Sequence, residues 1–478
     1  MKLGVKPIAD TRVILKSRDD VPALVASLLK IYTTPEYNDK IFNILEKRIL
    51  KGKKKTGRTG LSLWQIFVLA QFRLCLNLDY DWLHYMALSD STLRQLLGIE
   101  TETGFERIEF GYQRILDNVH LLDDETLREI NDVVVEFGQG VFKKKEGEAL
   151  QLKSDSFVVE NTVHFPTDYN LLFDSMRKAM DTMCKFTDKY PSIEGWRKLS
   201  DWQKSLKNLS RAVGRASSSG GKNKAKRIQY SAKKYLTKAI AFRNKIKSSK
   251  ESLVIEDAED LVRAILLDRF IELTDKHIDL VDRRLLKGEK IPHEEKLFSI
   301  FEEYTEWINK GKSHPNVELG KMMTITTDQY GLIIDYRLME HEADSEIVIE
   351  IADTVLQKYS VDSWSFDKGY YKKENKDLLQ LEIPNLIMPK KGKLTKLEKE
   401  EEHEASFKKS RNMHSAVESN INELEHNGLD KCPDKGYHGF KRYVSIGIVA
   451  HNLHRIGKQL IKLELAKQKK KERLRQAA

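Results

Sequence analysis

The sequence contains few cysteines and no long apolar run. Its three cysteines, Cys75, Cys184 and Cys432, form neither a C-x-x-C pair nor a zinc-binding spacing. We therefore expect reduced thiols and a cytoplasmic protein, not a secreted one stabilised by disulfides. No segment approaches the roughly 18 apolar residues that a membrane-spanning helix needs, and the first residues lack the apolar stretch of a signal peptide. These absences predict that a membrane is not a partner.

Acidic residues are missing from one long segment. Residues 204–250 hold 15 lysines and arginines and no aspartate or glutamate, and residues 455–478 hold nine basic and two acidic residues. Because the whole chain has a net charge of only +10, the remainder is net acidic. Concentrated positive charge is typical of a protein that binds nucleic acid. A solvated, lysine-rich helix stays the alternative for either segment taken alone.

Residues 1–147 have the pattern of a helical region. Within residues 61–98, three short helical stretches are separated by polar turns, which is the pattern of a helix-turn-helix. Residues 91–97 are then the candidate recognition helix, and Arg94 is a candidate DNA contact. Any small helical bundle has the same pattern, so a bundle without DNA-reading function stays an alternative.

A strand pattern begins near residue 149 and resumes near residue 321. β-Branched and aromatic residues alternate with polar ones in both places, and a turn at 328–331 predicts a hairpin. A Pro-Thr-Asp sequence ending at Asp168 predicts the start of a helix between the two regions. The expected strands are 149–166, the two arms of a hairpin within 321–340, 360–366 and 383–390.

The order of strands and helices predicts an α/β fold with an RNase H-like catalytic core. One strand precedes an antiparallel pair, and helical crossovers then lead to two more strands, which gives a mixed five-stranded sheet with helices. The chain divides on this basis into an all-α N-terminal region, the core, a large helical insertion and a basic tail. Their expected bounds are 1–147 for the N-terminal region, 148–168 with 318–463 for the core, 169–317 for the insertion and 464–478 for the tail.

Three carboxylates fall where this fold would bring them together. Asp155 lies on the first strand and Asp367 directly follows the fourth, and these two strands are neighbours in the fold. Glu418 lies on a helix expected over 405–425. Two like charges about 4 Å apart repel by about 4 kcal/mol at an effective dielectric constant near 20, so such a cluster needs a cation. Mg²⁺, or Mn²⁺ as a substitute, and two-metal phosphodiester cleavage are the expectation.

Each of these acids also has a simpler interpretation when it is taken alone. Asp155 would be a polar residue on an exposed strand position, Asp367 a turn residue, and Glu418 one of several solvated acids on its helix. His341 and Asp344 follow the hairpin and are weaker candidates for places near the metals, since a single histidine is more often structural.

Several blocks of the sequence resemble the DDE transposases of bacterial insertion sequences, specifically the ISNCY-like group and its relatives. The blocks run in the family's order and together cover most of the chain apart from 180–290. They are 57–99 in the N-terminal region, 154–179 around the first aspartate, 296–333 leading into the hairpin, Phe-Asp-Lys-Gly-Tyr-Tyr at 366–371, and 416–432 around the glutamate.

The resemblance implies that Asp155, Asp367 and Glu418 are the metal-binding catalytic residues of a DNA transposase. Such an enzyme binds the terminal inverted repeats of its element on double-stranded DNA, cleaves at their ends and joins the freed 3′-hydroxyl to target DNA. It is expected to act as a homodimer in a synaptic complex at the bacterial nucleoid. An inactive or domesticated DNA-binding protein, and an RNase H-fold nuclease without strand transfer, are the alternatives.

The sequence departs from the family around the glutamate. Many relatives carry tyrosine and arginine seven and four residues before it and lysine seven after it, where this chain has Arg411, His414 and Glu425. Helical offsets of four and seven place Arg411 and His414 on the face of Glu418, where they would contact phosphate. Glu425 cannot replace the lysine. The DNA-contact candidates in the insertion are Arg211, Arg215, Lys222, Lys224, Lys226, Arg227, Lys233 and Lys234.

Overall fold

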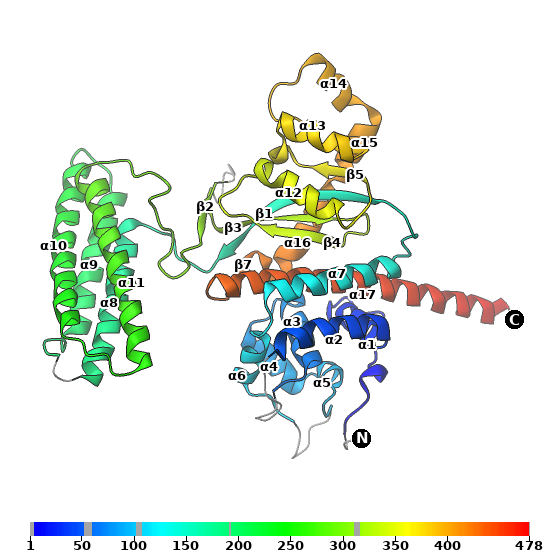
Figure 1. The fold of residues 1–478 in the computed structure, drawn as a ribbon, viewed down its shortest axis with the longest axis horizontal. Helices are drawn as coiled ribbons and strands as arrows, with labels where there is room; N and C mark the ends of the chain where they lie inside the picture. Colours follow the sequence, from blue (N-terminus) through cyan, green and yellow to red (C-terminus); the bar gives the residue numbers. More distant parts are fainter. Residues whose placement is uncertain (1–3, 52–59, 102–107, 191–192, 310–315, 478) are drawn as a thin grey trace. The chain divides into compact units, whose positions relative to one another are not determined.

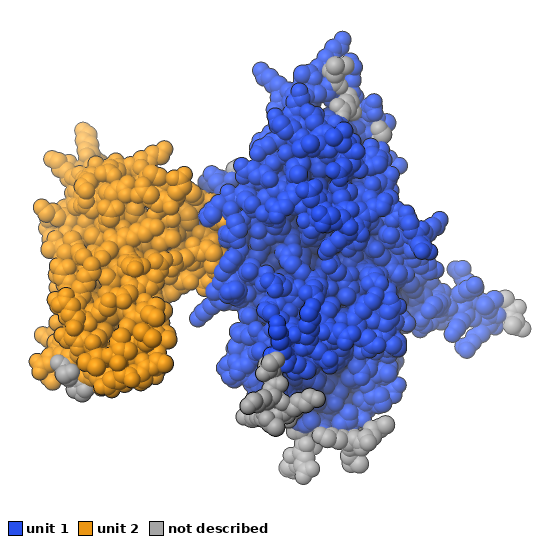
Figure 2. All heavy atoms as spheres, viewed as in Figure 1, with its two compact units in different colours: residues 1–162, 308–478 blue, residues 163–307 orange. Residues whose placement is uncertain are grey.

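The computed structural model describes residues 4–51, 60–101, 108–190, 193–309 and 316–477. The chain forms two compact units, residues 1–162 with 308–478 and residues 163–307 (Figures 1 and 2). Within the described residues, no helix combines the length and the apolar character that crossing a membrane requires. All three cysteines are free thiols.

The described residues include a mixed sheet of seven strands, six of which lie in the first unit while β2 spans the boundary at residue 308. Four of its neighbouring pairs are β3 beside β1, β1 beside β5, β5 beside β6, and β4 beside β3. The predicted hairpin is confirmed by the antiparallel pairing of β3 with β4, and the predicted adjacency of the first and fourth strands by the parallel pairing of β1 with β5. The strands are β1 (Leu150–Asn161), β2 (Glu306–Ile308), β3 (Glu318–Thr327), β4 (Ile333–Leu338), β5 (Val361–Phe366), β6 (Asn385–Ile387) and β7 (Lys431–Cys432).

The sheet has two strands more than the five that we expected. β2 has three residues and β7 has two, and such short strands are too brief to produce an alternating sequence pattern. β7 pairs with the C-terminal end of β1, where Asn161 lies opposite Cys432. These two short strands therefore arise from their neighbours in space, which the local sequence does not reveal.

One apolar face of the sheet is covered by α12 (Asp344–Leu356) and α13 (Lys373–Glu382). Trp364 and Phe366 of β5 are fully buried there, and their rings stack 5.0 Å apart. Tyr370 is also fully buried, and its hydroxyl lies 2.6 Å from that of Thr324, so it belongs to the core. The segment that follows β5 is thereby held rigidly.

The N-terminal helices share this unit with the sheet and do not form a separate region. α1, α3 and α7 pack against the long C-terminal helix α17 (Tyr437–Ala477), and α7 and α17 also contact β4. Of the tail predicted over 464–478, the described residues 464–477 continue α17. The helices are α1 (Val21–Tyr32), α2 (Pro35–Ile49), α3 (Leu63–Cys75), α4 (Tyr80–Ser89), α5 (Ser91–Leu96), α6 (Tyr112–Val119) and α7 (Asp124–Val141).

A buried ion pair joins α3 to the segment before α17. Arg73 is 2% exposed, and its guanidinium donates to both carboxylate oxygens of Asp434, at 2.6 and 3.1 Å. The same guanidinium lies 4.0 Å from the ring centroid of Tyr80. The pairing explains how an otherwise apolar, buried helix accommodates an arginine, since a buried charge needs a partner with good geometry.

The second unit is a bundle of four helices, α8 (Asp168–Lys189), α9 (Leu199–Ser218), α10 (Lys224–Glu251) and α11 (Ala258–Val281). Thr167 caps α8 as predicted, because its side chain accepts a hydrogen bond from the Asn170 N–H. The unit covers 163–307, whereas we expected 169–317. The earlier start has a physical reason, since His164 forms an ion-pair contact with Asp174 of α8 and attaches the preceding segment to the bundle.

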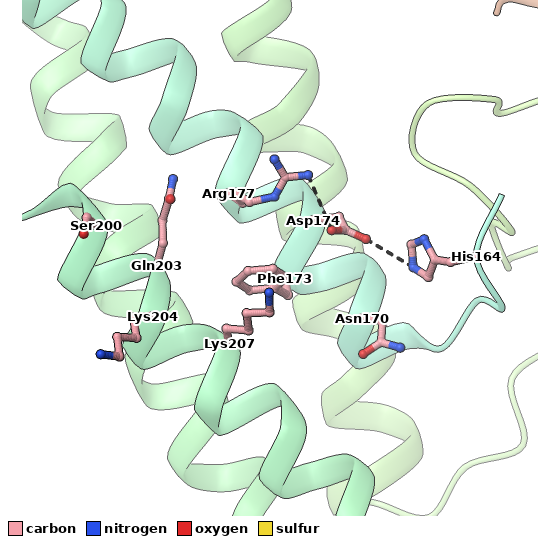
Figure 3. Close-up of a pocket in the computed structure, with 9 residues that line it drawn as sticks. All are labelled: His164, Asn170, Phe173, Asp174, Arg177, Ser200, Gln203, Lys204 and Lys207. Carbon is pink, nitrogen blue, oxygen red and sulfur yellow. Dashed lines mark ion pairs between the residues drawn. The ribbon is translucent and has the colours of Figure 1, made fainter. Parts of the chain in front are cut away.

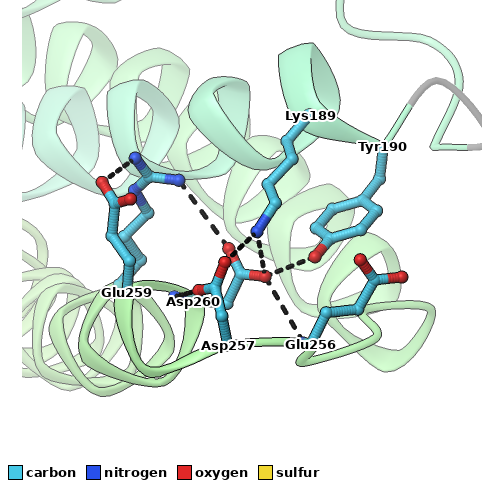
Figure 4. A network of polar contacts seen from close by, with 7 residues as sticks. Lys189, Tyr190, Glu256, Asp257, Glu259 and Asp260 are labelled. Carbon is cyan, nitrogen blue, oxygen red and sulfur yellow. Dashed lines mark hydrogen bonds and ion pairs between the residues drawn. The ribbon is translucent and has the colours of Figure 1, made fainter.

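A polar network ties the end of α8 to the start of α11 (Figure 4). The Lys189 ammonium lies 2.7 Å from a carboxylate oxygen of Asp257 and 2.6 Å from one of Asp260. The Tyr190 hydroxyl also donates to Asp260, whose side chain is fully buried. Hydrogen bonds from Lys189 and Tyr190 lower the pKa of Asp260.

This network predicts an acid-sensitive bundle. Because the folded pKa of Asp260 is lowered, its stabilising contribution is present above the unfolded value near 4 and is lost as the pH falls through the folded value. We expect Asp260→Asn to destabilise the bundle at neutral pH and to weaken its loss of stability below about pH 4. Urea unfolding followed by hydrogen exchange of α8 and α11 peptides measures both effects. Asp188→Asn, at an exposed position of α8, is the control, and an equal effect there would contradict the prediction.

Candidate active site

The register of the sheet places Asp155 and Asp367 side by side. β1 and β5 run parallel, and Ser154 pairs with Phe366, so each aspartate is the next residue along its strand direction. Asp367 directly follows β5 and precedes the short helical turn Lys368–Tyr370. The buried Phe366 and Tyr370 on either side of it fix the backbone of this exposed aspartate.

The pKa of Asp155 is affected by Asp367 and by two more acids. Burial is the largest cause that raises the pKa of Asp155 to about 6, and the negative charges of Asp367, Asp344 and Glu418 act in the same direction. A hydrogen bond from the Ser156 N–H lowers this pKa and opposes part of the shift. That N–H lies 2.7 Å from the carboxylate. The charges of Asp367, Asp344 and Glu418 thus act on Asp155, and Asp367 and Glu418 also line a common pocket.

Asp344 is the member of this group that the sequence indicated least clearly. It is the first residue of α12, and a Cβ placed on Gly369 would lie only 2.7 Å from its Oδ2. Its Oδ1 is buried and has no hydrogen-bond partner. Burial and the nearby charge of Asp367 raise its pKa, while a hydrogen bond from Ser156 lowers it. A buried carboxylate oxygen without a donor is an atom that a bound cation would satisfy.

A pocket of about 450 Å³ brings the predicted glutamate and phosphate-contact residues to Asp367. His414 donates to or accepts from the Ser365 hydroxyl at 2.9 Å through Nδ1, and its Nε2 is buried without a partner. Burial lowers the pKa of His414, so the imidazole is neutral at pH 7. The pocket is lined by Phe366, Asp367, Lys368, Ile387, Pro389, Arg411, Asn412, His414, Ser415 and Glu418.

The helix that we expected over 405–425 is two helices. α15 (Ala405–Met413) ends and α16 (Ser415–Leu424) begins on either side of His414. The helix is therefore interrupted at His414, yet Arg411, His414 and Glu418 line the same pocket, as the helical spacing predicted. Glu425 opens a π-helical turn after α16 and does not line this pocket.

Lys153 is a site residue that our reading of the sequence missed. It lies two residues before Asp155 on β1 and lines a neighbouring pocket of about 390 Å³ together with Ser363, Ser365 and Lys409. Its side chain is half-buried, and no described carboxylate lies within ion-pair distance of it. The two-residue spacing from Asp155 was the available signal, because alternate residues of a strand point to the same side of the sheet.

The eight predicted DNA contacts of the insertion are all exposed, and none forms an ion pair with a described carboxylate. The second half of α10 differs, because Arg243 and Lys247 pair with Asp275, and Lys250 pairs with Asp268, on α11. Within α10, the positive charge that is free to meet a polyanion therefore lies in the first half of the helix.

Arg94 is not available to contact DNA. It is 1% exposed, and its guanidinium donates to the carbonyls of Ala87, Glu100 and Ile108 at 2.9, 2.6 and 3.0 Å. α5 has only six residues, and Leu93 and Leu96 are buried on it as well. Residues 91–97 therefore do not form the recognition helix that we expected, because α5 turns its side chains into the N-terminal core.

The donor set of the carboxylate site fits a hard divalent cation, since it consists of carboxylate oxygens, one of them buried without a partner. As they stand, no three His, Cys, Asp or Glu side chains in the described part of the chain are arranged to hold a metal ion. The chain was also compared with known proteins, and no family model, no curated protein and no solved structure matches it.

Proposed function

We propose that the chain is a DNA transposase of the DDE type with an RNase H-like catalytic core. The observation that carries the proposal is the position of Asp155 on β1 beside Asp367, which follows the end of β5, with the charges of Asp344 and Glu418 also acting on Asp155. The two pairings that we expected for this core, the antiparallel hairpin of β3 with β4 and the adjacency of β1 with β5, support the proposal.

The residues of the site have distinct roles in the proposed reaction. Asp155, Asp367 and Glu418, assisted by Asp344, would hold Mg²⁺ or Mn²⁺, which when bound would lower the pKa of water and neutralise developing charge on a phosphodiester. The neutral His414 presents its free Nε2 within the pocket as a hydrogen-bonding group for a phosphate oxygen or for water. Arg411 is exposed at the same pocket, and its guanidinium can donate two hydrogen bonds to one phosphate.

Lys153 would hold the strand beside the cleaved bond. As a half-buried cation with no carboxylate partner in the described chain, it is suited to a phosphate of the bound strand. We expect Lys153→Met to raise the KM for DNA by about tenfold, since a charge-assisted hydrogen bond contributes roughly 1.5–3 kcal/mol. Steady-state cleavage assays measure this, with Lys373→Met, at an exposed position of α13, as the control. An unchanged KM would remove Lys153 from the binding site.

The exposed basic residues of the bundle would contact the DNA backbone. If six of them meet phosphates, the logarithm of the affinity should fall with the logarithm of the salt concentration with a slope of about −5. Replacing Lys222, Lys224, Lys226 and Arg227 by alanine should make the slope shallower by about 3 to 4.

Alanine at Arg243, Lys247 and Lys250, whose charges are already paired on the bundle, should change that slope much less and serves as the control. Anisotropy titrations of labelled duplex over a range of salt concentrations give both slopes. A wild-type slope near zero would contradict backbone binding.

The test of the proposed function uses DNA that flanks the gene as a labelled linear substrate, incubated with Mg²⁺ or with EDTA. Metal-dependent cleavage at a discrete inverted repeat, with joined strand-transfer products, is the expected result. Cleavage without joined products would favour a nuclease on the same fold, and binding without cleavage would favour an inactive DNA-binding protein. Two ends must be processed together, so a dimer is expected on DNA that carries both ends.

A further inference from the structure

A second pocket lies within the helical bundle, far in sequence from most of the carboxylate residues. It has a volume of about 720 Å³, within the range of small-molecule sites, and lies between α8 and α9 (Figure 3). Its lining combines cationic, amide and aromatic side chains. These are His164, Asn170, Phe173, Asp174, Arg177, Ser200, Gln203, Lys204 and Lys207.

The single carboxylate that lines this pocket, Asp174, already has two basic neighbours. Asp174 lies 3.3 Å from His164 Nε2 and 3.7 Å from the Arg177 guanidinium, and its side chain is 14% exposed. Arg177 also contacts Asp181, 3.7 Å away, which in turn accepts a hydrogen bond from Gln203 at 2.6 Å. The wall formed by α8 is therefore a polar surface on which Asp174 and Asp181 share the guanidinium of Arg177.

The opposite wall of the pocket carries unpaired positive charge. Lys204 and Lys207 lie one helical turn apart on α9, are both exposed, and pair with no carboxylate among the described residues. Among the residues that line the pocket, Lys204, Lys207 and Arg177 outnumber the single carboxylate of Asp174, so the lining has a net positive charge. A pocket of this kind favours an anionic ligand, and two adjacent lysines suit a phosphate.

Phe173 adds a feature that a site for a simple anion does not need. Its ring is half-buried and, in the view of Figure 3, lies between the α8 polar side chains and those of Lys204 and Lys207. An aromatic face beside cationic side chains is the combination that binds the bases of unpaired nucleic acid, because every base offers a face for stacking. Asn170, Ser200 and Gln203 supply amide and hydroxyl groups around it.

We propose that this pocket binds a nucleotide, with its phosphate at Lys204 and Lys207 and its base against Phe173. The shared chemistry is a nucleoside phosphate, which either an unpaired nucleotide of a DNA strand or a free mononucleotide would provide. The site lies within the bundle and uses none of the four carboxylates, so it does not depend on strand cleavage. It gives the bundle a defined recognition site in addition to a charged surface.

The test uses the full-length protein and fluorescence anisotropy with a short labelled single-stranded oligonucleotide. The variants are the pair Lys204→Ala/Lys207→Ala and the single Phe173→Leu, which keeps apolar volume but removes the aromatic face. The control pair is Lys185→Ala/Lys290→Ala, which removes two exposed charges of the same unit outside the pocket. Unlabelled deoxyadenosine monophosphate and the matching duplex are the competitors.

We expect each pocket variant to weaken single-strand binding by about fivefold to a hundredfold, while the control pair changes it by less than about threefold. Competition by the mononucleotide, lost in the pocket variants, would identify the free nucleotide as a ligand. Binding of the oligonucleotide without such competition would assign the pocket to an unpaired nucleotide of a strand.

Equal losses in the control pair and the lysine pair would overturn the proposal, because binding would then follow overall charge. Unchanged binding by Phe173→Leu would overturn the stacking of a base. If Phe173→Leu fails to fold, the lysine pair decides alone, since both of its positions are exposed.

Discussion

Replacing Asp367 by asparagine is expected to abolish metal-dependent strand cleavage while leaving DNA binding within about twofold. The amide keeps the size of the side chain but removes a charged oxygen ligand from the edge of the sheet shared with Asp155. Metal charge stabilises the transition state of phosphodiester cleavage by several kcal/mol, and each 1.4 kcal/mol is a factor of ten, so the rate should fall about a thousandfold or more. The fold should persist because Asp367 is exposed.

The measurement is end-mapping of the labelled flanking DNA with wild type and variant, each with Mg²⁺ and with EDTA. Asp377→Asn on α13 is the matched control, since it makes the same chemical change at an exposed aspartate outside the pocket. Anisotropy on the uncleaved duplex verifies that binding survives. Cleavage that persists in Asp367→Asn, or that continues in EDTA, would show that these carboxylates do not form the active site.

Replacing Gly457 by alanine is expected to destabilise the first unit by about 2–3 kcal/mol, because overpacking at a close contact typically costs this much. A Cβ at this position of α17 would lie 1.7 Å from the Ala23 carbonyl oxygen of α1 and 2.4 Å from its carbon. Both atoms belong to a backbone, so neither can move without shifting a helix. This cost outweighs the roughly 1 kcal/mol by which alanine is favoured over glycine inside a helix.

Gly140→Ala on α7 provides the matched comparison. Gly140 is exposed, and no atom lies within 4 Å of the position that its Cβ would occupy, so alanine should stabilise the protein slightly, by up to about 1 kcal/mol. Urea unfolding followed by circular dichroism gives both changes, which are expected to have opposite signs. A neutral or stabilising effect of Gly457→Ala would mean that α1 and α17 do not approach each other so closely.

The sequence predicted those strands of the sheet that a short stretch of neighbouring residues identifies. Alternation along β1, the turn between β3 and β4 and the short run of β5 each identify a strand, and the pairing of β1 with β5 placed Asp155 beside Asp367. The same approach failed at Arg94, because a polar residue on a short amphipathic helix has the same pattern whether its guanidinium meets DNA or three carbonyl groups. It also failed to predict the break between α15 and α16 at His414.

By itself, the sequence determined which segments form the main strands and most helices, where basic residues are concentrated, and that Asp155 lies on one strand while Asp367 follows another. Those properties depend on periodicity, composition and turn residues, all of which are read over a few positions. Only the tertiary structure decided that Asp344 joins the acids, that Lys153 has no carboxylate partner, that the N-terminal helices pack on α17, and that a charged pocket opens between α8 and α9. Each of these features depends on contacts between residues that are distant in sequence. A pattern over a few neighbouring residues cannot predict such contacts.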